Sequence, residues 1–474
     1  GSKAVEVFHH REHDYVTAST GIDRVEAQVP ERFEELLAEA PVEFPRDVAL
    51  NRYEDTHLSG DVLVTAPLER AGRAARTTLV TQLSDHGEIT RETALADLRD
   101  CATAYRTADD IREAAREYTG LAVPADAPRA ELVEADRRVL GLLLAPSGAR
   151  VTAPEFDPFG VNSGGYGYTW VGEDAWVAGN LLGAADELGL DVDRELVEAA
   201  RFHCGTQFDD GTWPHRVWAS DGAIAPGWAN ANVENADSGE YRADLTARTA
   251  AFLATLLRRR RGELPDDLAG KVRGTLEAAV AAMDDSFAEN GLPEPCLNVW
   301  EDAIGQFAGA AATYLRAYAA VARAPVPDGL ADDAREGAER VYGGLDRLWD
   351  DTFDFYALRL DEGDRDARLD ASTFALVGAF REYASLEGKE LTETDLDRLA
   401  DHVGSLLNGL YRNPRDSPVA GLARYEGDRW RAGEAGGTEE RVWSLSTAMG
   451  AAGAAGLGEL LDGYGRSGEA FFER

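Results

Sequence analysis

Lysine, cysteine and methionine are scarce in this 474-residue chain. Only three of its 48 basic residues are lysines, and it has two methionines and three cysteines. The cysteines, Cys101, Cys204 and Cys296, lie far apart, their number is odd, and their spacing matches no metal motif. These features argue against a disulfide framework and against a cysteine-based metal site.

Long apolar runs and basic patches are also missing. No apolar run reaches the roughly 20 residues of a membrane span, and we identify no signal peptide. The arginine run Arg258–Arg261 ends a predicted helix, where cations are favourable, so it does not indicate nucleic-acid binding. The chain opens with Gly-Ser, which resembles a cloning scar, so we expect the natural N-terminus to be missing. We therefore expect neither a membrane nor a nucleic-acid partner, and a cytoplasmic location.

Acidic residues are abundant: 86 against 48 basic ones, a formal net charge of −38. They are spread along the whole chain, which indicates a solvated surface that repels itself unless cations screen it. This composition is typical of a high-salt cytoplasm, as in haloarchaea. We expect folding to need high salt, but no cofactor and no metal; calcium is left open, because no loop has a recognised ligand pattern.

The chain divides into three parts. Residues 1–90 contain short β-branched stretches such as "GDVLVTAPL" and "RTTLVTQL", which predict strands, with a helix expected at "PERFEELLAEA". Residues 91–128 predict a helical linker. Residues 129–474 predict helices separated by loops rich in Gly, Asp, Pro and Trp.

Ten helices are predicted from the apolar periodicity. Their ranges are 130–145, 173–189, 194–206, 241–261, 266–288, 302–323, 331–350, 367–387, 393–411 and 441–462. Successive helical hairpins favour a toroid, an (α/α) barrel, over a simple bundle.

Several alternate helices are predicted to begin with an aromatic residue next to acids. These clusters contain Trp170, Trp300, Trp349 and Trp443. Each Trp alone is explained by core packing. If the alternate helices form the inner ring, however, their starts meet at one end, in a funnel lined by aromatic rings and carboxylates.

The stretch "CLNVWEDAIGQF" places Trp300, Glu301 and Asp302 at the predicted start of one helix. Asn298 followed three residues later by Glu301 fits a capping box. Alternatively, Glu301 is a carboxylic acid held beside an indole at the rim of a pocket. A Trp-lined acidic funnel suits sugars, and cleavage of a glycosidic bond needs two carboxyl groups.

In their order along the chain, several motifs resemble glycoside hydrolase family 15, which includes glucoamylases, glucodextranases and certain trehalases. They are "GGYGYTWVGEDAW", "DDGTWPHRVWASDG", "NVWEDAIGQF", "LDAST" and "GLARYEGDRW…VWSLSTA", covering roughly residues 155–450. The resemblance implies a mainly α fold, an (α/α)6 barrel, with residues 1–90 a remnant of an N-terminal β-sandwich. It also implies release of glucose from the non-reducing ends of α-glucans with inversion.

The resemblance assigns Glu301 as the general acid, with Trp300 helping to keep it protonated by desolvation. The residues expected to bind substrate are Tyr168, Trp170, Asp174, Trp213, His215, Arg216, Asp244, Trp300, Arg424, Tyr425, Asp428 and Trp443.

Two departures from the family pattern stand out. Glu173 replaces an Arg that would donate hydrogen bonds to the sugar, and the expectation is that Glu173 turns outward while Arg216 or Arg242 substitutes for that Arg. The catalytic base normally follows the last motif, near the final helix pair, and the ten predicted helices fall short of twelve. We therefore expect a barrel incomplete at its C-terminal end.

For the missing base, the stand-ins within the chain are Glu434, Glu439 and Glu440, which also fit a solvated acidic loop.

Four functions are weighed. The first is an inverting α-glucosidase acting on α-glucan oligosaccharides, with carboxyl groups roughly 6.5–9.5 Å apart. The second is a trehalase of the same family, which the sequence does not separate from the first. The third is an inactive glycan-binding relative without the base. A phosphorylase is disfavoured, because we find no phosphate cradle near Glu301.

Overall fold

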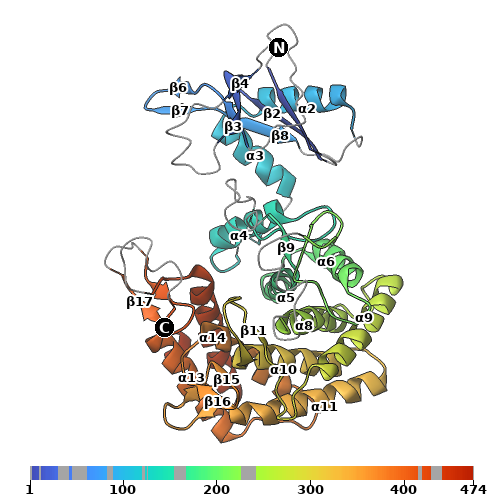
Figure 1. Ribbon diagram of the computed structural model, residues 1–474, viewed down its shortest axis with the longest axis vertical. Coiled ribbons are helices and arrows are strands. Elements are labelled where there is room, and N and C mark those ends of the chain that lie inside the picture. The colour runs from blue at the N-terminus through green and yellow to red at the C-terminus, as the bar shows by residue number, and fades with distance from the viewer. Residues whose placement is uncertain are drawn as a thin grey trace. The chain divides into compact units, whose positions relative to one another are not determined.

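The computed structural model describes residues 3–9, 12–29, 42–44, 61–82, 89–119, 123–124, 126–153, 167–225, 242–414, 419–428 and 440–472. The chain forms two compact units (Figure 1), residues 1–142 with 154–167 and residues 143–153 with 168–474. Within the described ranges, no helix combines the length and the apolar character that crossing a membrane requires.

The first unit contains antiparallel strands in two three-stranded sheets, ordered β1-β2-β8 and β4-β3-β5, and a hairpin, β6-β7. The strands are β1 (Val5–His9), β2 (Glu12–Ala18), β3 (Arg24–Val29), β4 (Val42–Phe44), β5 (Asp61–Thr65), β6 (Glu69–Ala71), β7 (Ala74–Arg76) and β8 (Leu79–Gln82). Strands are confirmed in the two stretches quoted above; the expected helix "PERFEELLAEA" lies outside the described residues.

Three helices follow these strands: α2 (Arg91–Ala104), α3 (Ala108–Thr119) and α4 (Ala130–Leu143). The α2 helix packs against β2 and β8, and Tyr15, Ala94 and Leu98 form a small buried core there. Contacts group nearly all of α4 with this unit, whereas the sequence analysis assigned it to the barrel. The three-part division of the chain stays a prediction.

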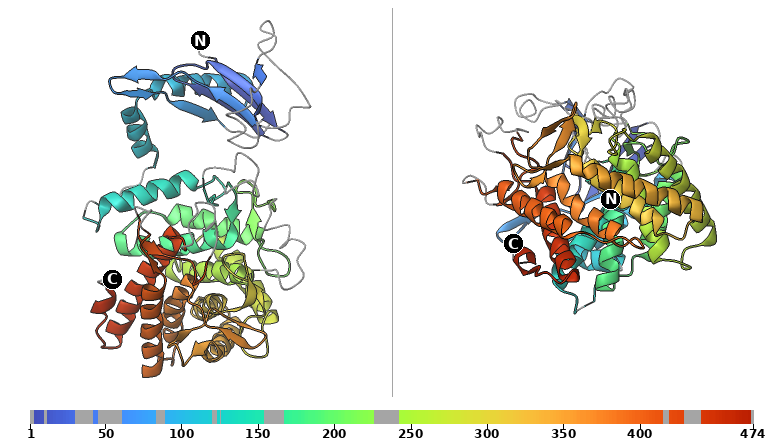
Figure 2. Two further views of the ribbon diagram at one scale, coloured as in Figure 1. Left: turned by 60° about the vertical axis from the view of Figure 1, so that its left-hand side comes forward. Right: turned by 90° about the horizontal axis from the view of Figure 1, so that it is seen from below.

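The second unit is the (α/α)6 barrel. Its helices are α5 (Val171–Leu188), α6 (Asp193–Thr206), α8 (Asp244–Arg259), α9 (Asp266–Asp285), α10 (Ala308–Ala322), α11 (Asp328–Gly344), α12 (Ala375–Ala384), α13 (Glu393–Gly409), α14 (Ser444–Gly463) and α15 (Glu469–Phe472), with 3-10 turns η1 (Leu345–Arg347) and η2 (Ala371–Phe374). The inner helices contact one another in the order α5, α8, α10, α12, α14, and the outer helices α6, α9 and α11 cover them (Figures 1 and 2).

The α10 helix occupies a central position, because it packs against α8, α11 and α12. Its sequence "AGAAATYLRAYAAVA" is rich in alanine, and most of its residues are buried. Small residues allow this close approach: a Cβ at Gly309 would lie 2.6 Å from the Ser372 hydroxyl of η2.

Short strands connect the barrel helices. They are β9 (Thr169–Trp170), β10 (Arg216–Val217), β11 (Cys296–Leu297), β12 (Ile304–Phe307), β13 (Trp349–Asp350), β14 (Phe355–Tyr356), β15 (Arg359–Asp361), β16 (Asp364–Asp366), β17 (Tyr411–Arg412) and β18 (Gly421–Leu422). The order β11-β12-β15-β16 forms one sheet, and the others pair as β9-β10, β13-β14 and β17-β18.

Each of the ten predicted helical ranges contains a helix, but the range 302–323 was wrong at its start. Residues 304–307 form β12, which pairs with β11 and β15, and α10 begins only at Ala308. Ile304 and Phe307 are three apart, so their spacing fitted a helix, but the burial of Gly305 and Phe307 alternates as in a strand.

Two of the four aromatic clusters do begin helices. Trp170 is the N-cap residue of α5 and Trp443 that of α14. Trp300 lies in the β11–β12 connection instead, and Trp349 lies in β13, where it packs edge-on against Tyr356. The expectation that all four open helices was therefore wrong for Trp300 and Trp349.

Candidate functional site

The β11–β12 connection carries Glu301. Asn298 closes this loop, because its side-chain oxygen accepts hydrogen bonds from the amides of Asp302 (3.0 Å) and Ala303 (3.3 Å). Asn298 therefore stabilises a turn and not a helix, and the capping-box interpretation was wrong. Glu301 has φ 61°, the left-handed region that residues with a Cβ rarely adopt. Such strain is concentrated at functional sites.

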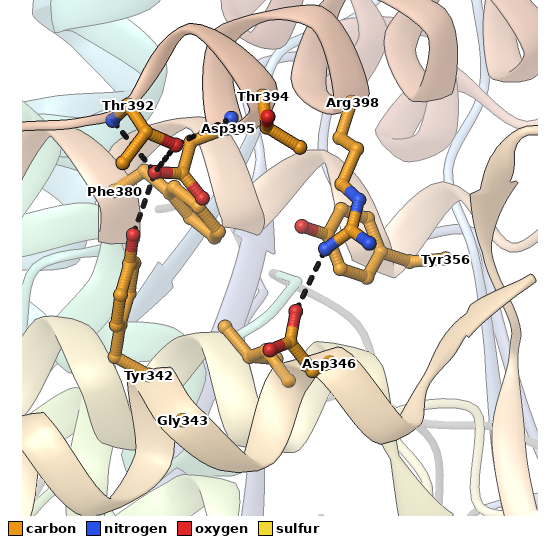
Figure 3. A pocket seen from close by; sticks show the side chains of 10 residues that line it. Tyr342, Gly343, Asp346, Tyr356, Phe380, Thr392, Thr394, Asp395 and Arg398 are labelled. Atoms are coloured by element: carbon orange, nitrogen blue, oxygen red, sulfur yellow. Dashed lines mark hydrogen bonds and ion pairs between the residues drawn. The ribbon is translucent and has the colours of Figure 1, made fainter.

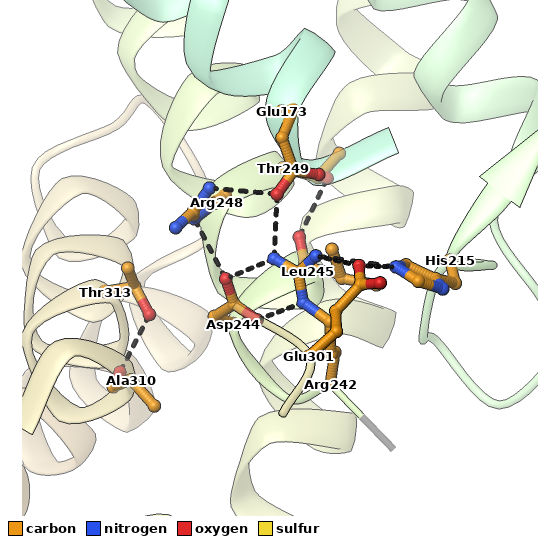
Figure 4. A network of polar contacts seen from close by, with 10 residues as sticks. All are labelled: Glu173, His215, Arg242, Asp244, Leu245, Arg248, Thr249, Glu301, Ala310 and Thr313. Carbon is orange, nitrogen blue, oxygen red and sulfur yellow. Dashed lines mark hydrogen bonds and ion pairs between the residues drawn. The ribbon is translucent and has the colours of Figure 1, made fainter. Parts of the chain in front are cut away.

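The Glu301 carboxylate faces two basic side chains (Figure 4). Its Oε1 lies 2.6 Å from His215 Nε2 and accepts a hydrogen bond from Arg242 Nη1 at 3.2 Å. Although burial raises the pKa of Glu301, the hydrogen bond and charge of His215 and the charge of Arg242 outweigh it and lower the pKa below the usual value. The expectation that desolvation beside Trp300 keeps Glu301 protonated is therefore wrong for the ligand-free protein.

Arg242 joins three carboxylates. Its guanidinium binds Asp244 through Nε (3.1 Å) and Nη2 (2.9 Å), Glu173 through Nη2 (2.8 Å), and Glu301. Arg248 of α8 binds Asp244 and Glu173 from the other side, at 3.1 and 3.4 Å. Although burial raises the pKa of Asp244, Arg242 and Arg248 lower it to about 2.

Glu173 thus turns toward this network, which we call the Arg242 cluster: Glu173, His215, Arg242, Asp244, Arg248 and Glu301. The sequence analysis considered Arg216 and Arg242 as substitutes for the arginine that Glu173 replaces, and Arg242 lies in this cluster. The guanidinium of Arg216 instead lies over the rings of Tyr168 and Trp170, at 4.6 and 4.9 Å. Trp170 also packs edge-on against His215, so these aromatic residues form the wall behind the cluster.

Asp174 and Trp213 lie within the protein wall. The Asp174 side chain is 1% exposed and contacts Arg150 at 3.4 Å and His203 at 3.1 Å. Trp213 is buried, and its Nε1 donates to the carbonyl of His203 at 2.8 Å. Both side chains contact His203 of α6 and do not face an open funnel. Their assignment as substrate-binding residues stays a prediction.

Arg424 and Tyr425 contact the turn that carries Glu301, and Trp443 lies against Arg424. Arg424 binds Asp428 through two hydrogen bonds of 2.7 Å and lies 3.5 Å from Asp302. Its guanidinium also lies over the ring of Trp443, at 4.7 Å, and over that of Trp300, at 5.6 Å. The structure therefore brings most of the "RYEGD" residues to the Trp300–Asp302 turn.

Tyr425 fixes the same turn, because its hydroxyl donates to Asp302 at 2.7 Å. The Asp428 side chain is 1% exposed, so it orients Arg424. The contacts of Tyr425 with Asp302 and of Asp428 with Arg424 explain why these three residues have this spacing in the "RYEGD" motif.

Asp370 is a site residue that the sequence analysis missed. Its carboxyl group is buried and accepts hydrogen bonds from Trp300 Nε1 at 3.0 Å and from the amide of Ser372 at 2.8 Å. Burial, which outweighs these hydrogen bonds, raises its pKa to about 6. The motif "LDAST" drew attention to this segment, but nothing in it indicated contact with Trp300.

The candidate bases are tested only in part. Glu434 and Glu439 lie outside the described residues. Glu440 pairs with Arg412, and it accepts a hydrogen bond from the amide of Gly427 at 2.5 Å. Among the described residues, no group of three or more His, Cys, Asp or Glu side chains is arranged to hold a metal ion.

Some buried polar atoms near Glu301 form no hydrogen bond within the described part of the chain: Glu173 Oε2, His215 Nδ1 and Trp443 Nε1. Buried polar groups normally have partners, so each of these atoms can bind a ligand or a water molecule. Together they supply both donors and acceptors, as hydroxyl groups require.

A separate pocket of about 240 Å³ contains none of these groups (Figure 3). Its polar lining is largely self-satisfied, because Tyr342 donates to Asp395 at 2.7 Å and Arg398 to Asp346 at 2.7 Å. We therefore place the candidate site at Glu301.

Comparisons with known proteins agree with this architecture. Residues 1–94 match a family described as a domain of unknown function, DUF7997, and no curated protein matches the chain. The solved structure of a bacterial glucoamylase complexed with acarbose is similar over 96% of this chain, with a TM-score of 0.55 and 12% identity. The chain spans 65% of the length of that glucoamylase.

Two further structures are similar over shorter ranges. A wild-type glycosidase covers 72% of this chain and 81% of its own (TM-score 0.48, 16% identity). A glucoamylase from Saccharomycopsis fibuligera covers 69% and 71% (TM-score 0.48, 14% identity). The first comparison, at 12% identity, shows a glucoamylase-like fold.

Proposed function

We propose that the chain is a family 15 glycoside hydrolase of the glucoamylase type, which releases glucose from the non-reducing ends of α-glucan oligosaccharides with inversion. The observation that carries the proposal is the position of Glu301. It occupies a left-handed turn, beside Trp300 and 2.6 Å from His215, in a barrel with a glucoamylase-like fold.

In this proposal Glu301 is the general acid. It gives a proton to the glycosidic oxygen as the bond to C1 breaks, while a base takes a proton from the water that attacks C1 from the opposite face. His215 Nε2 lies 2.6 Å from Glu301 Oε1, within reach for proton exchange with the carboxylate, so we assign His215 as the residue that positions the acid. The base stays a prediction, with Glu434, Glu439 and Glu440 as its candidates.

The substrate contacts follow from the buried polar atoms that have no hydrogen-bond partner among the described residues. Glu173 Oε2 would accept a hydrogen bond from a sugar hydroxyl, and Trp443 Nε1 would donate one. The rings of Trp300 and Trp443 would pack against apolar sugar faces. Arg242 pairs with both Glu173 and Glu301, so its positive charge weakens the repulsion between these two carboxylates.

A second candidate is a glycan-binding protein that does not hydrolyse its ligand. The lowered pKa of Glu301 favours it, because an ionised carboxylate cannot donate a proton. So does Glu440, whose carboxylate is engaged by Arg412.

The test is to incubate the protein in concentrated KCl with maltooligosaccharides or trehalose and to follow released glucose and its anomer by NMR. We expect β-glucose from maltooligosaccharides, and a loss of about 10²–10⁴-fold in kcat for Glu301→Gln. The control is Glu336→Gln, because Glu336 is exposed on α11.

Release from trehalose alone would instead assign a trehalase. Binding of maltotriose without any release, by a folded protein, would refute hydrolysis and leave the glycan-binding function.

A further inference from the structure

The pocket of about 240 Å³ in Figure 3 lies between α11 and α13 and is unrelated to Glu301. Side chains bridge the two helices at two places. Tyr342 donates to Asp395 at 2.7 Å, and Arg398 donates to Asp346 at 2.7 Å. These polar groups pair with one another, but several of them keep donors or acceptors that a ligand can use.

Tyr342 offers a ring face to the pocket. Its opposite face is covered by Tyr383, with the ring centroids 4.2 Å apart and the planes 13° apart. In Figure 3 the Tyr342 ring is seen edge-on, with Asp346 and Arg398 across the pocket from it. An aromatic face beside a few polar groups is the surface on which the apolar side of a sugar ring packs.

Arg398 supplies hydrogen-bond donors on the other side of the pocket. Its guanidinium is held in place, because it pairs with Asp346 and lies over the Trp349 ring at 4.9 Å. Its contacts with Asp346 and with the Tyr356 hydroxyl leave further N–H groups available, since a guanidinium carries several donors.

Asp395 supplies an acceptor. Its Oδ2 accepts hydrogen bonds from the Tyr342 hydroxyl and from the amide and hydroxyl of Thr392, at 2.7 and 2.6 Å. Its Oδ1 accepts none from the residues that the structure describes, and Figure 3 shows this oxygen turned toward the pocket. A hydroxyl group in the pocket can therefore donate to it.

The charges and the size of the pocket restrict the ligand. Arg398 balances Asp346, and the remaining charge of Asp395 disfavours an anion, whereas the Arg398 guanidinium disfavours a cation. The volume of about 240 Å³ is below the roughly 300–1,000 Å³ of sites for drug-sized ligands. A small, neutral molecule that carries hydroxyl groups and one apolar face meets these conditions.

We propose that this pocket binds one neutral pyranose ring, such as glucose or a terminal glucosyl unit. The ring packs against Tyr342, one hydroxyl accepts a hydrogen bond from Arg398, and another donates to Asp395 Oδ1. The site is independent of the proposed hydrolysis, because no residue that lines it belongs to the Arg242 cluster.

The test is ¹⁹F NMR of the whole protein labelled with 3-fluorotyrosine and titrated with methyl α-D-glucopyranoside in concentrated KCl. The Tyr342 signal is identified by its absence in Tyr342→Phe. We expect this signal to shift and to saturate with the glucoside. Glu301→Gln should keep the shift, so the failure of hydrolysis and the failure of this site are distinguishable.

Two variants test the pocket with matched controls. Gly343 lines the pocket, and a Cβ there meets no atom within 4 Å, so Gly343→Leu has room to obstruct the opening and should weaken binding about tenfold or more. Gly329→Leu makes the same change at an open position of α11 outside the pocket and should have no effect.

Arg398→Gln removes donors and should weaken binding about tenfold. Its control is Arg201→Gln, which breaks an exposed pair with Asp267 elsewhere in the barrel. Glucose 6-phosphate should bind more weakly than the glucoside, because it brings negative charge next to Asp395. The proposal would be overturned by a Tyr342 signal that does not shift, by an equal affinity in the parent, Gly343→Leu and Arg398→Gln, or by tighter binding of the phosphate.

Discussion

Glu301 and Asp370 are two carboxyl groups that meet at Trp300, one next to it in sequence and one hydrogen-bonded to its indole. Glu301 lies among cations, His215 and Arg242, which lower its pKa. Asp370 contacts no cation among the described residues, and burial raises its pKa to about 6. Two groups of similar chemistry are thus driven toward opposite protonation states by their neighbours.

The opposite pKa shifts suit Asp370 and Glu301 to different roles. Asp370 is 1% exposed, so its carboxyl group accepts the hydrogen bond of the Trp300 indole but cannot reach a substrate. Glu301 is more accessible, at 11% of its side chain, and its charge depends on partners that a ligand could rearrange. Environments that divide the pKa values of neighbouring acids are typical of catalytic sites.

The largest expected effect comes from Arg242→Met. This change leaves Glu173, Asp244 and Glu301 without their shared cation, and breaking a buried ion pair costs about 3–5 kcal/mol. The free energy of unfolding, measured with urea in concentrated KCl, should fall by this amount. Arg381→Met, which breaks an exposed pair, should cost about 1 kcal/mol or less. Equal losses in both variants would mean that the Arg242 cluster is not held by its central cation.

Asp370→Asn tests the other side of the comparison. The folded pKa is raised to about 6 from 3.8, so the stabilisation due to protonation is complete below pH 3.8 and is lost as the pH rises through 6. The amide oxygen of Asn can still accept from Trp300 and Ser372, without an ionisable group. Asn should therefore stabilise the protein at pH 8 by up to about 3 kcal/mol, and by roughly 1 kcal/mol less at pH 5. Urea unfolding at both values measures this, and a pH-independent difference would contradict it.

His215→Gln should raise the pKa of Glu301. Gln keeps a hydrogen-bond donor but removes the positive charge, so burial, which raises the pKa, is less opposed. The ¹³C carboxyl signal of Glu301, assigned from its absence in Glu301→Gln, reports this pKa directly. An unchanged titration would show that Arg242 alone sets the charge of Glu301.

The smallest effect is expected for Trp300→Phe. It removes the Nε1–Asp370 hydrogen bond, a net loss of about 1 kcal/mol in the free energy of unfolding. In a double-mutant cycle with Asp370→Ala, which removes the acceptor, the coupling should be about 0.5–1.5 kcal/mol. A coupling near zero would show that the Trp300–Asp370 hydrogen bond does not stabilise the folded protein.

The barrel could be predicted from the sequence because its helices repeat apolar residues with a clear period and end at Gly, Pro and Asp. The start of α10 could not, because residues three apart in β12 fit either a strand or a helix until β11 and β15 are seen beside them. Glu301, Arg424 and Tyr425 were found from motifs. The partners Arg242 and Asp370 are 59 and 69 residues away from Glu301 in the chain, and only the fold brings them near. The charge of Glu301 depends on such partners, which explains why its protonation was predicted wrongly.

The left-handed backbone at Glu301 has a consequence for the evolution of the chain. Glycine adopts this conformation without strain, whereas another residue typically loses about 1–3 kcal/mol there. Glu301→Gly would relieve this strain but would leave His215 and Arg242 without this carboxylate, and breaking a buried ion pair costs about 3–5 kcal/mol. The side chain at position 301 thus maintains the backbone conformation that carries it, and a glycine should be favoured there only in relatives that have also lost the two basic residues.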